Sequence, residues 1–378
     1  MAGIFRYLPE DHRSVRSRRL SRAGNAGRRT SCPGVKRIVP RPVTLRAAAR
    51  LRHERHGARR LARAIAALLI GAVGGAFAQH LSETDLCLLV ALRDASPTDT
   101  VAAVRGRCQS QTASYFERRH REEDTALRAG SAYLPHRPNY VLPIGVGSGF
   151  QAAPGNTDDN EFILQLSLKV PLWRRPDGSA APFYFAYTGR SWWQAYNSER
   201  SSPFREYNHA PEVFYERRFA APLGGWMLRA LRLGLEHESN GRDVPFSRSW
   251  NRAFAQLDAD NGARWWSSMR LWARIPESAK SDPTSADGDD NPEIRKYLGN
   301  GEWRVGYRAE WGDLRLKLRR SFSSGGKGAA QLGVIIPFTR GETTRARFYL
   351  HVFDGYGESL IDYDRRVRRI GLGFMLSD

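Results

Sequence analysis

The sequence lacks what a helical membrane protein needs. A membrane-spanning helix takes about 20 consecutive apolar residues, and the clearest apolar run, Ala64 to Val73, is too short to span. Cysteine is also scarce: Cys32, Cys87 and Cys108 are the three in the chain, and no zinc-ligand spacing occurs. These absences exclude a helical membrane span and a zinc-stapled domain.

Acidic residues are scarce only in the N-terminal part of the chain. The formal charge of +20 and the pI of about 10.4 would suggest a nucleic-acid or anionic-membrane partner. Residues 1–78, however, hold 18 of the 59 Lys and Arg residues and 3 of the 39 Asp and Glu residues, which places +15 of the +20 there. The remainder is nearly balanced, so no nucleic-acid partner is expected.

This basic end contains an export signal. Arg59, Arg60 and Arg63 precede the apolar run, and the stretch GGAFA follows with the A-x-A pattern at Ala76 and Ala78. The pattern predicts a signal peptide over residues 59–78, cleaved before Gln79. A buried helix of a soluble protein is the alternative. Residues 1–58 are Arg-rich without apolar periodicity, and we interpret them as a leader added by a start codon assigned too far upstream. A genuine long basic presequence is the other interpretation.

Export restricts the mature chain to a few compartments. An exported Gram-negative protein without a spanning helix is periplasmic, secreted or an outer-membrane barrel. Cleavage would remove Cys32 and leave Cys87 and Cys108, and an even pair in an oxidising compartment indicates a disulfide. Helix-compatible segments at 86–92 and 115–128 lie within residues 79–130. We predict that this region is a small, partly helical N-terminal extension in the periplasm.

The periodicity changes to two from about Asn139. One parity is apolar and the other largely polar, which is typical of strands with two different faces. About twelve such strands of roughly ten residues predict an all-β, twelve-stranded antiparallel transmembrane barrel over residues 131–378. A soluble β-sandwich or a lipocalin-type barrel is the alternative, because alternation alone does not tell inside from outside. One clear apolar row consists of Phe162, Leu164, Leu166, Leu168, Val170 and Leu172.

Other side chains fit the same barrel. Arg232, Arg270, Arg315 and Lys317 fall on the alternate parity and would line a polar interior. The aromatic pairs at 192–193 and 265–266 would suit the aromatic girdles at the membrane interfaces.

A polar pair interrupts one apolar row. His237 and Ser239 continue the parity of Leu231, Leu233 and Leu235, so they would share the outward face. A polar pair facing lipid is costly unless it has a purpose. Asn251 can reach this face from the next strand, across the hairpin. Serine, histidine and an orienting third group form a hydrolytic triad, although a His-x-Ser pair is by itself a weak signal and is more often structural.

The surrounding sequence resembles the outer-membrane phospholipase A family of Gram-negative bacteria. The resemblance rests on HESNGR at 237–242, SRSWNR at 247–252, SWWQ at 191–194, SSPFRE at 201–206, DDNP at 289–292 and GYGESLIDY at 355–363. It covers about residues 139–378 and does not extend into 1–130. The family is a twelve-stranded antiparallel barrel that hydrolyses acyl esters of phospholipids, at sn-1 and sn-2, and of lysophospholipids.

The resemblance also implies the roles of individual residues. Ser239 would be the nucleophile, His237 the general base, Asn251 the group that orients His237, and the backbone N–H of Gly241 an oxyanion donor. The family needs Ca²⁺ and is active as a homodimer, with the active site on the outer-leaflet side. The implied calcium ligands are the Arg242 carbonyl, Ser247, Ser201 of the partner subunit and, in the resting monomer, Asp290.

Two positions depart from the family pattern. Val244 stands where the family commonly has an Asp of the monomer calcium position, and Gly189 stands where it has a Gln at the dimer interface. The rival hypothesis for function is a non-catalytic outer-membrane barrel, a porin or structural protein, on the same scaffold.

Overall fold

A computed structural model describes residues 83–378, except for short stretches between strands and at loop tips: 152–156, 176–178, 180, 201–202, 263, 283, 286, 324 and 339–345. The predicted leader (1–58), the signal peptide (59–78) and Ser201 therefore lie outside the described residues. No helix within the described part is both long and apolar enough to cross a membrane.

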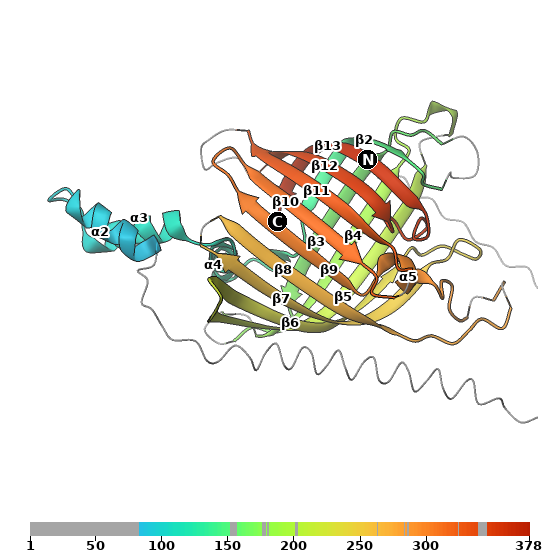
Figure 1. Ribbon diagram of the computed structural model, residues 1–378, viewed down its shortest axis with the longest axis horizontal. Helices are drawn as coiled ribbons and strands as arrows, with labels where there is room; N and C mark the ends of the chain where they lie inside the picture. Colours follow the sequence, from blue (N-terminus) through green and yellow to red (C-terminus); the bar gives the residue numbers. More distant parts are fainter. Residues whose placement is uncertain are drawn as a thin grey trace, which may run out of the picture. The chain divides into compact units, whose positions relative to one another are not determined.

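The fold is a closed antiparallel β-barrel of twelve strands (Figure 1). Neighbouring strands pair in sequence order from β2 to β13, and β13 pairs back to β2 and closes the sheet. This confirms the predicted fold class. The strands are β2 (Asn139–Ser148), β3 (Phe162–Pro171), β4 (Phe183–Trp193), β5 (Phe204–Leu223), β6 (Trp226–Ser239), β7 (Ser249–Asn261), β8 (Trp265–Ile275), β9 (Gly301–Arg308), β10 (Asp313–Arg320), β11 (Gly328–Pro337), β12 (Arg347–Tyr356) and β13 (Arg366–Ser377).

The described barrel region also contains three short elements: β1 (Leu134–Pro135), which pairs with β3; a 3-10 turn, η1 (Ser198–Arg200); and helix α5 (Ile294–Leu298), which lies between β8 and β9 along the chain. A longer helix, α4 (Tyr115–Arg128), precedes the strands.

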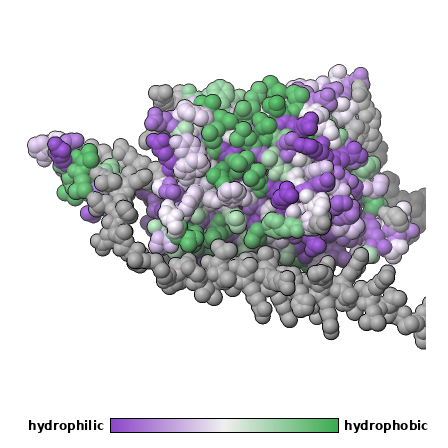
Figure 2. Space-filling view, in the orientation of Figure 1, coloured by the Kyte–Doolittle hydropathy of each residue, from purple (hydrophilic) through white to green (hydrophobic). Residues whose placement is uncertain are grey.

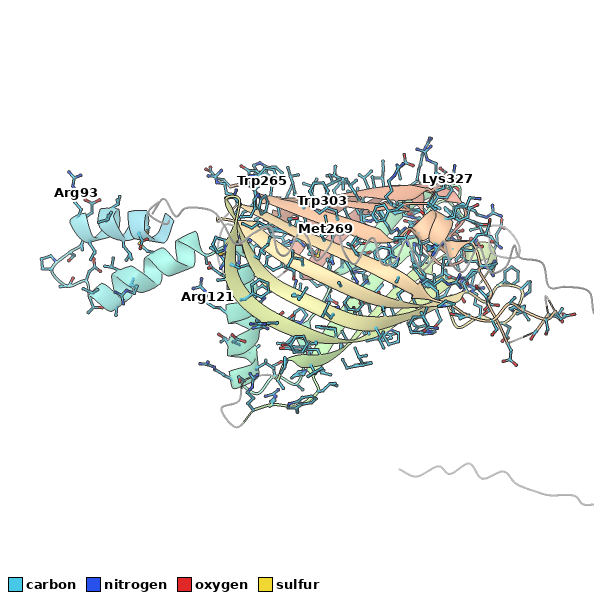
Figure 3. All side chains as sticks on the ribbon, turned by 60° about the horizontal axis from the view of Figure 1, so that its bottom comes forward. Arg93, Arg121, Trp265, Met269, Trp303 and Lys327 are labelled. Atoms are coloured by element: carbon cyan, nitrogen blue, oxygen red, sulfur yellow. A yellow bond between two sulfur atoms is a disulfide. The ribbon has the colours of Figure 1, made fainter. Side chains whose placement is uncertain are left out.

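The outer face of the barrel is apolar. Leu233 and Leu235 of β6 are 47% and 52% exposed, and Figure 2 shows apolar residues gathered across the barrel wall with polar residues toward both ends. Figure 3 labels three more exposed side chains, Trp265, Met269 and Trp303, on β8 and β9. An apolar face of this extent, on a closed sheet with a polar interior, is the arrangement of a membrane barrel and not of a lipocalin-type barrel.

The inner face carries paired charges, as the alternate parity predicts. Arg270 bonds both Glu212 and Glu236, at 2.7 and 2.9 Å. Arg232 bonds Glu216 at 2.6 Å and Asp258 at 2.7 Å, and all of these groups are buried. Buried charges remain ionised at acceptable cost only when they are paired in this way.

The two tryptophan pairs divide between the faces. Trp192 is fully buried and Trp266 is 8% exposed, whereas Trp265 is 45% exposed. Alternation along a strand sends adjacent residues to opposite sides, so only one member of each pair is available for an interfacial girdle. The expectation for both members was wrong for this reason.

Within the described residues, three helices precede the strands, which confirms a partly helical N-terminal extension. Helices α2 (Glu83–Arg93) and α3 (Val101–Thr112) are joined by a disulfide between Cys87 and Cys108, as predicted from the cysteine pair. Helix α4 begins at a capping box formed by Ser114 and Glu117. Ser114 Oγ donates to Asp260 of β7 at 2.5 Å, and the Phe116 amide donates to the same carboxylate at 3.3 Å. Helix α4 is thereby fixed to the barrel where β7 ends.

Candidate active site

The candidate site lies at the opposite end of β7, where the β6–β7 hairpin opens into its loop. The strand register pairs His237 with Asn251 and Ser239 with Ser249. On its other side β6 pairs with β5, which places His209 beside Ser239. His237, Ser239 and Asn251 are all half-buried. Because β6 keeps strict alternation from Ala230 onward, His237 and Ser239 share the outer face with Leu233 and Leu235.

A chain of hydrogen bonds leads from the histidine. His237 Nδ1 and Asn251 Oδ1 are 2.9 Å apart. Asn251 Nδ2 donates to Glu277 Oε1 at 3.1 Å, from the segment that follows β8. An amide has one acceptor end and one donor end. The carboxylate therefore takes the donor end and leaves Oδ1 to accept from His237.

The loop after Ser239 is organised by one buried side chain, Asn240. Its Oδ1 accepts from the Arg248 amide at 2.9 Å, and its Nδ2 donates to the Phe246 carbonyl at 2.9 Å. Gly241 follows with φ of 61°, and a Cβ built there meets nothing within 4 Å. The positive φ suits glycine, and the open space beside this backbone is next to Ser239 in the sequence.

Two residues with implied calcium roles meet at the end of this loop. Ser247 Oγ donates to Asp290 Oδ2 at 2.5 Å. Asp290 also forms an ion pair with Lys280, whose Nζ lies 2.5 Å from Oδ1 and donates to the Ser285 carbonyl at 2.7 Å. A hydroxyl and a carboxylate that converge are oxygen ligands of the kind that calcium takes. Here a lysine ammonium already neutralises that carboxylate.

The two departures from the family pattern have distinct surroundings. Val244 precedes Pro245 in the same loop as Gly241, linked by a cis peptide bond. Gly189 faces two tyrosines: a Cβ built there would lie 3.0 Å from Tyr207 Oη and 3.2 Å from Tyr187 Oη. Tyrosine rings thus fill the space that a longer residue 189 would need.

Three residues of the site were not singled out from the sequence: Asn240, Glu277 and Lys280. Asn240 lies inside the HESNGR motif, and its buried position could have been inferred from the hairpin. Glu277 and Lys280 belong to the long connection between β8 and β9, where no periodicity fixes which side chain returns to the barrel.

The chain is similar in sequence to known phospholipases. The family model described as phospholipase A1 matches residues 116–376. Over 224 residues the chain is 40% identical to phospholipase A1 of Escherichia coli strain K12, covering 59% of this chain and 72% of that protein. It is 33% identical over 271 residues to the putative phospholipase A1 of Neisseria meningitidis serogroup B, covering 67% of each.

Two solved structures are similar to the barrel. Outer membrane phospholipase A from Escherichia coli has a TM-score of 0.57 and 36% identity, covering 66% of this chain and 93% of that one. The outer membrane phospholipase dimer of Salmonella typhi, described with bound calcium, has a TM-score of 0.59 and 35% identity, covering 67% and 96%.

The barrel and its apolar outer wall define an integral outer-membrane protein, and the similarity to phospholipases makes it an enzyme. The chain belongs to the phospholipase A1 family, also known as outer-membrane phospholipase A. This family membership argues against the rival hypothesis, a non-catalytic barrel on the same scaffold.

Proposed function

We propose that this phospholipase is a calcium-dependent, dimer-activated hydrolase of the sn-1 and sn-2 acyl esters of phospholipids and lysophospholipids, acting through Ser239, His237 and Asn251. The observation that carries the proposal is the hydrogen bond between His237 Nδ1 and Asn251 Oδ1 on the outer face. An enzyme whose substrate is the membrane needs its reactive groups on that face.

The hydrogen bond selects the histidine tautomer. Because Asn251 Oδ1 is an acceptor, His237 Nδ1 must carry the proton, and Nε2 is left as the base. Nε2 would take the proton of Ser239 as Oγ attacks the ester carbonyl. The carbon–oxygen bond to the glycerol then breaks, and His237 returns the proton to the leaving alkoxide. Water, activated by the same Nε2, releases the fatty acid from Ser239.

The negative charge that develops on the carbonyl oxygen needs donors. The backbone N–H of Gly241 is the proposed donor, in a loop held by Asn240. In the dimer, the Arg242 carbonyl, Ser247 and Ser201 of the partner subunit would hold calcium, which would supply positive charge near that oxyanion. In the resting monomer, Asp290 would be a further ligand. Ser247 and Asp290 support this by their 2.5 Å contact.

The location of the site supports action on the outer leaflet. Barrels of this kind have short periplasmic turns and longer external loops. The site end of the barrel carries the connections from Ile275 to Gly301 and from Trp193 to Phe204, whereas the far end has the short turns Leu223–Trp226 and Asn261–Trp265. We therefore assign residues 79–130 to the periplasmic side, after export by the signal at 59–78.

The test is a lipase assay on the purified chain in detergent micelles. Fatty acid release from phosphatidylcholine labelled separately at sn-1 and sn-2, and from lysophosphatidylcholine, is measured with calcium and with chelator. Wild type should release acid from each substrate only with calcium. Chemical cross-linking should show a dimer under the active condition.

Matched variants separate the parts of the proposal. Ser239→Ala should abolish release, whereas Ser249→Ala, a neighbouring hydroxyl on β7, should keep most of it. Undiminished activity in Ser239→Ala would overturn the mechanism. Full activity in chelator would overturn the calcium requirement alone.

A further inference from the structure

A cavity inside the barrel is lined by far more cations than carboxylates. Its volume is about 140 Å³, and its lining includes eight Lys and Arg side chains but three Asp and Glu side chains. This is well above the roughly 10–15 Å³ that one water molecule requires. The cavity lies in the interior, away from the candidate active site on the outer face.

Most of these cations form ion pairs with carboxylates, but Arg190, Arg304 and Lys317 together have fewer carboxylate partners than charges. Arg304 and Lys317 share the single carboxylate of Glu302, at 3.0 and 3.7 Å. Arg190 has no ion pair among the described residues. Its guanidinium lies over the Trp192 ring at 4.6 Å, and Nη1 donates to the Glu358 carbonyl at 3.3 Å. Nε and Nη2 are buried without a hydrogen-bond partner within the described residues. Two partly buried cations thus share one carboxylate, and a third cation on the same cavity wall has no ion pair within the described part of the chain.

A buried histidine lies beside the same group. His351 is fully buried, and neither of its ring nitrogens has a hydrogen-bond partner within the part of the chain that the structure describes. Its ring lies 6.3 Å from the Tyr140 ring and 5.9 Å from the Tyr349 ring, and both tyrosines line the cavity. The unpartnered nitrogens of Arg190 belong to the cavity wall, and a polar occupant would satisfy them.

We propose that the interior cavity binds an inorganic oxyanion, such as phosphate, between Arg190 and Lys317. A tetrahedral anion supplies several acceptor oxygens, which can take two N–H groups of a guanidinium and an ammonium proton together. It would also balance the excess charge of this group.

The test uses the full chain in detergent micelles, in a buffer of constant ionic strength without oxyanions. Added inorganic phosphate should raise the melting temperature of the wild type saturably, by roughly 5–10 °C once it reaches about a hundred times its Kd. Lys317→Met and Arg190→Met should lose most of this rise. Arg366→Met is the matched control, because Arg366 is exposed and paired with Asp354 outside the cavity, and it should retain the rise.

Each outcome of these measurements supports or overturns oxyanion binding in the cavity. In buffer without oxyanions, Lys317→Met should be at least as stable as the wild type, because Glu302 keeps its closer ion pair with Arg304. Selenate soaked into crystals should give an anomalous peak beside Lys317. No saturable shift in the wild type would overturn the proposal, and so would an equal shift in Lys317→Met, because phosphate would then bind away from Lys317.

A second inference comes from an independent observation, the contact between Asn251 and Glu277, and it rests on the proposed triad. The geometry points to Glu277 as a positioning residue for the hydrolysis. Its carboxylate holds the amide with Oδ1 toward His237 and adds the negative charge that Asn lacks. The imidazolium formed during attack would then be stabilised through the amide.

The charged surroundings of His237 allow this role. On the outer face β5 contributes His209, β7 contributes the neutral Asn251, and the segment after β8 contributes Glu277. Glu236 and Glu238 of β6 belong to the lumen face, where both bond Arg252. Glu277 is therefore the carboxylate linked to His237 on its own side.

The test measures pH profiles of kcat and KM for Glu277→Ala and Glu277→Gln, with Glu310→Gln as the control on an exposed turn. Glu277→Ala should lower kcat by roughly 10-fold at unchanged KM, and Glu277→Gln should lower it less, because its carbonyl still accepts from Asn251. Both should move the acid limb of the profile to lower pH. Variants that match Glu310→Gln in kcat and in profile would refute the role of Glu277. An active Ser239→Ala would instead refute the triad itself.

Discussion

Strand β6 places polar side chains on both of its faces, and the two sets are held differently. On the lumen face Arg232 and Glu236 are buried, and each has charged partners on neighbouring strands. On the outer face His237 and Ser239 are half-buried, and the hydrogen bond of His237 is to a neutral amide.

The difference separates stability from chemistry along a single strand. Full pairing fixes the lumen charges and costs their reactivity, since an ion-paired group has little freedom to exchange protons. On the outer face, the imidazole of His237 and the hydroxyl of Ser239 lie on the same side of β6 as Leu233 and Leu235. The following changes test this division, from the largest expected effect to the smallest.

Replacing the proposed base on the outer face should remove activity without destabilising the fold. His237→Ala should lower kcat by at least about 10³-fold, because the proposed nucleophile, Ser239, would lose its proton acceptor. The melting temperature in micelles should stay close to that of the wild type. A kinetic assay paired with circular dichroism measures both. A large drop in melting temperature would mean that His237 is structural.

Replacing a lumen charge should do the opposite. Arg232→Ala leaves Glu216 and Asp258 buried without their shared cation, which should cost about 3–5 kcal/mol of unfolding free energy. Folded protein should keep near-normal kcat. Chemical denaturation measures the loss, and Lys296→Ala, which removes an exposed pair with Glu293, is the control with an effect below about 1 kcal/mol.

A charge on the lipid side of the same strand should destabilise by burial in lipid. Leu233 is near the middle of β6 and 47% exposed. Leu233→Arg should cost about 2–4 kcal/mol of folding free energy in a bilayer, and Leu235→Arg, nearer the strand end, should cost less. Equilibrium folding into vesicles measures both. Equal costs would mean that the two positions lie at the same membrane depth.

The lumen network continues into helix α4, where it should respond to acid. Burial and the nearby Arg218 lower the pKa of His120 to about 4 from 6.5. Between these values the unfolded chain binds a proton that the folded chain does not, so stability is lost as pH falls from about 6.5 toward 4. The loss should be about 1–2 kcal/mol. Amide exchange of α4 at pH 7 and pH 5 measures it, and His120→Gln should be insensitive.

The smallest effect concerns calcium. Lys280 pairs with Asp290 at 2.5 Å, so an added cation must displace the ammonium. Lys280→Met should lower the calcium concentration needed for half-maximal binding by a few-fold, measured by terbium luminescence or calorimetry. Lys296→Met is the control. A higher calcium requirement in Lys280→Met would mean that the lysine assists the site.

The barrel could be predicted from the sequence because the alternation of apolar and polar residues is repeated in strand after strand. Leu231, Leu233 and Leu235 need only a period of two to be placed on one face, and the same rule placed His237 and Ser239 with them. Pairing of neighbours along the chain then brought Asn251 across the hairpin. Local periodicity and short connections suffice for these conclusions.

Other contacts depend on long connections or on distant parts of the chain. Glu277 and Lys280 return to the barrel from the segment between β8 and β9, whose path follows from loop packing and not from any period. Asp260 meets Ser114 across 146 positions of sequence. The prediction for the tryptophan pairs was wrong for a simpler reason, since two adjacent residues of a strand point to opposite faces.

The ion pairs that cross the lumen have a consequence for the cell envelope. Arg270 joins Glu212 of β5 and Glu236 of β6 from its own strand β8, and Arg137 reaches the same two carboxylates. Solutes would have to break these contacts to pass through. The barrel can therefore present a lipid-cleaving surface to the membrane without opening a leak between the periplasm and the outside.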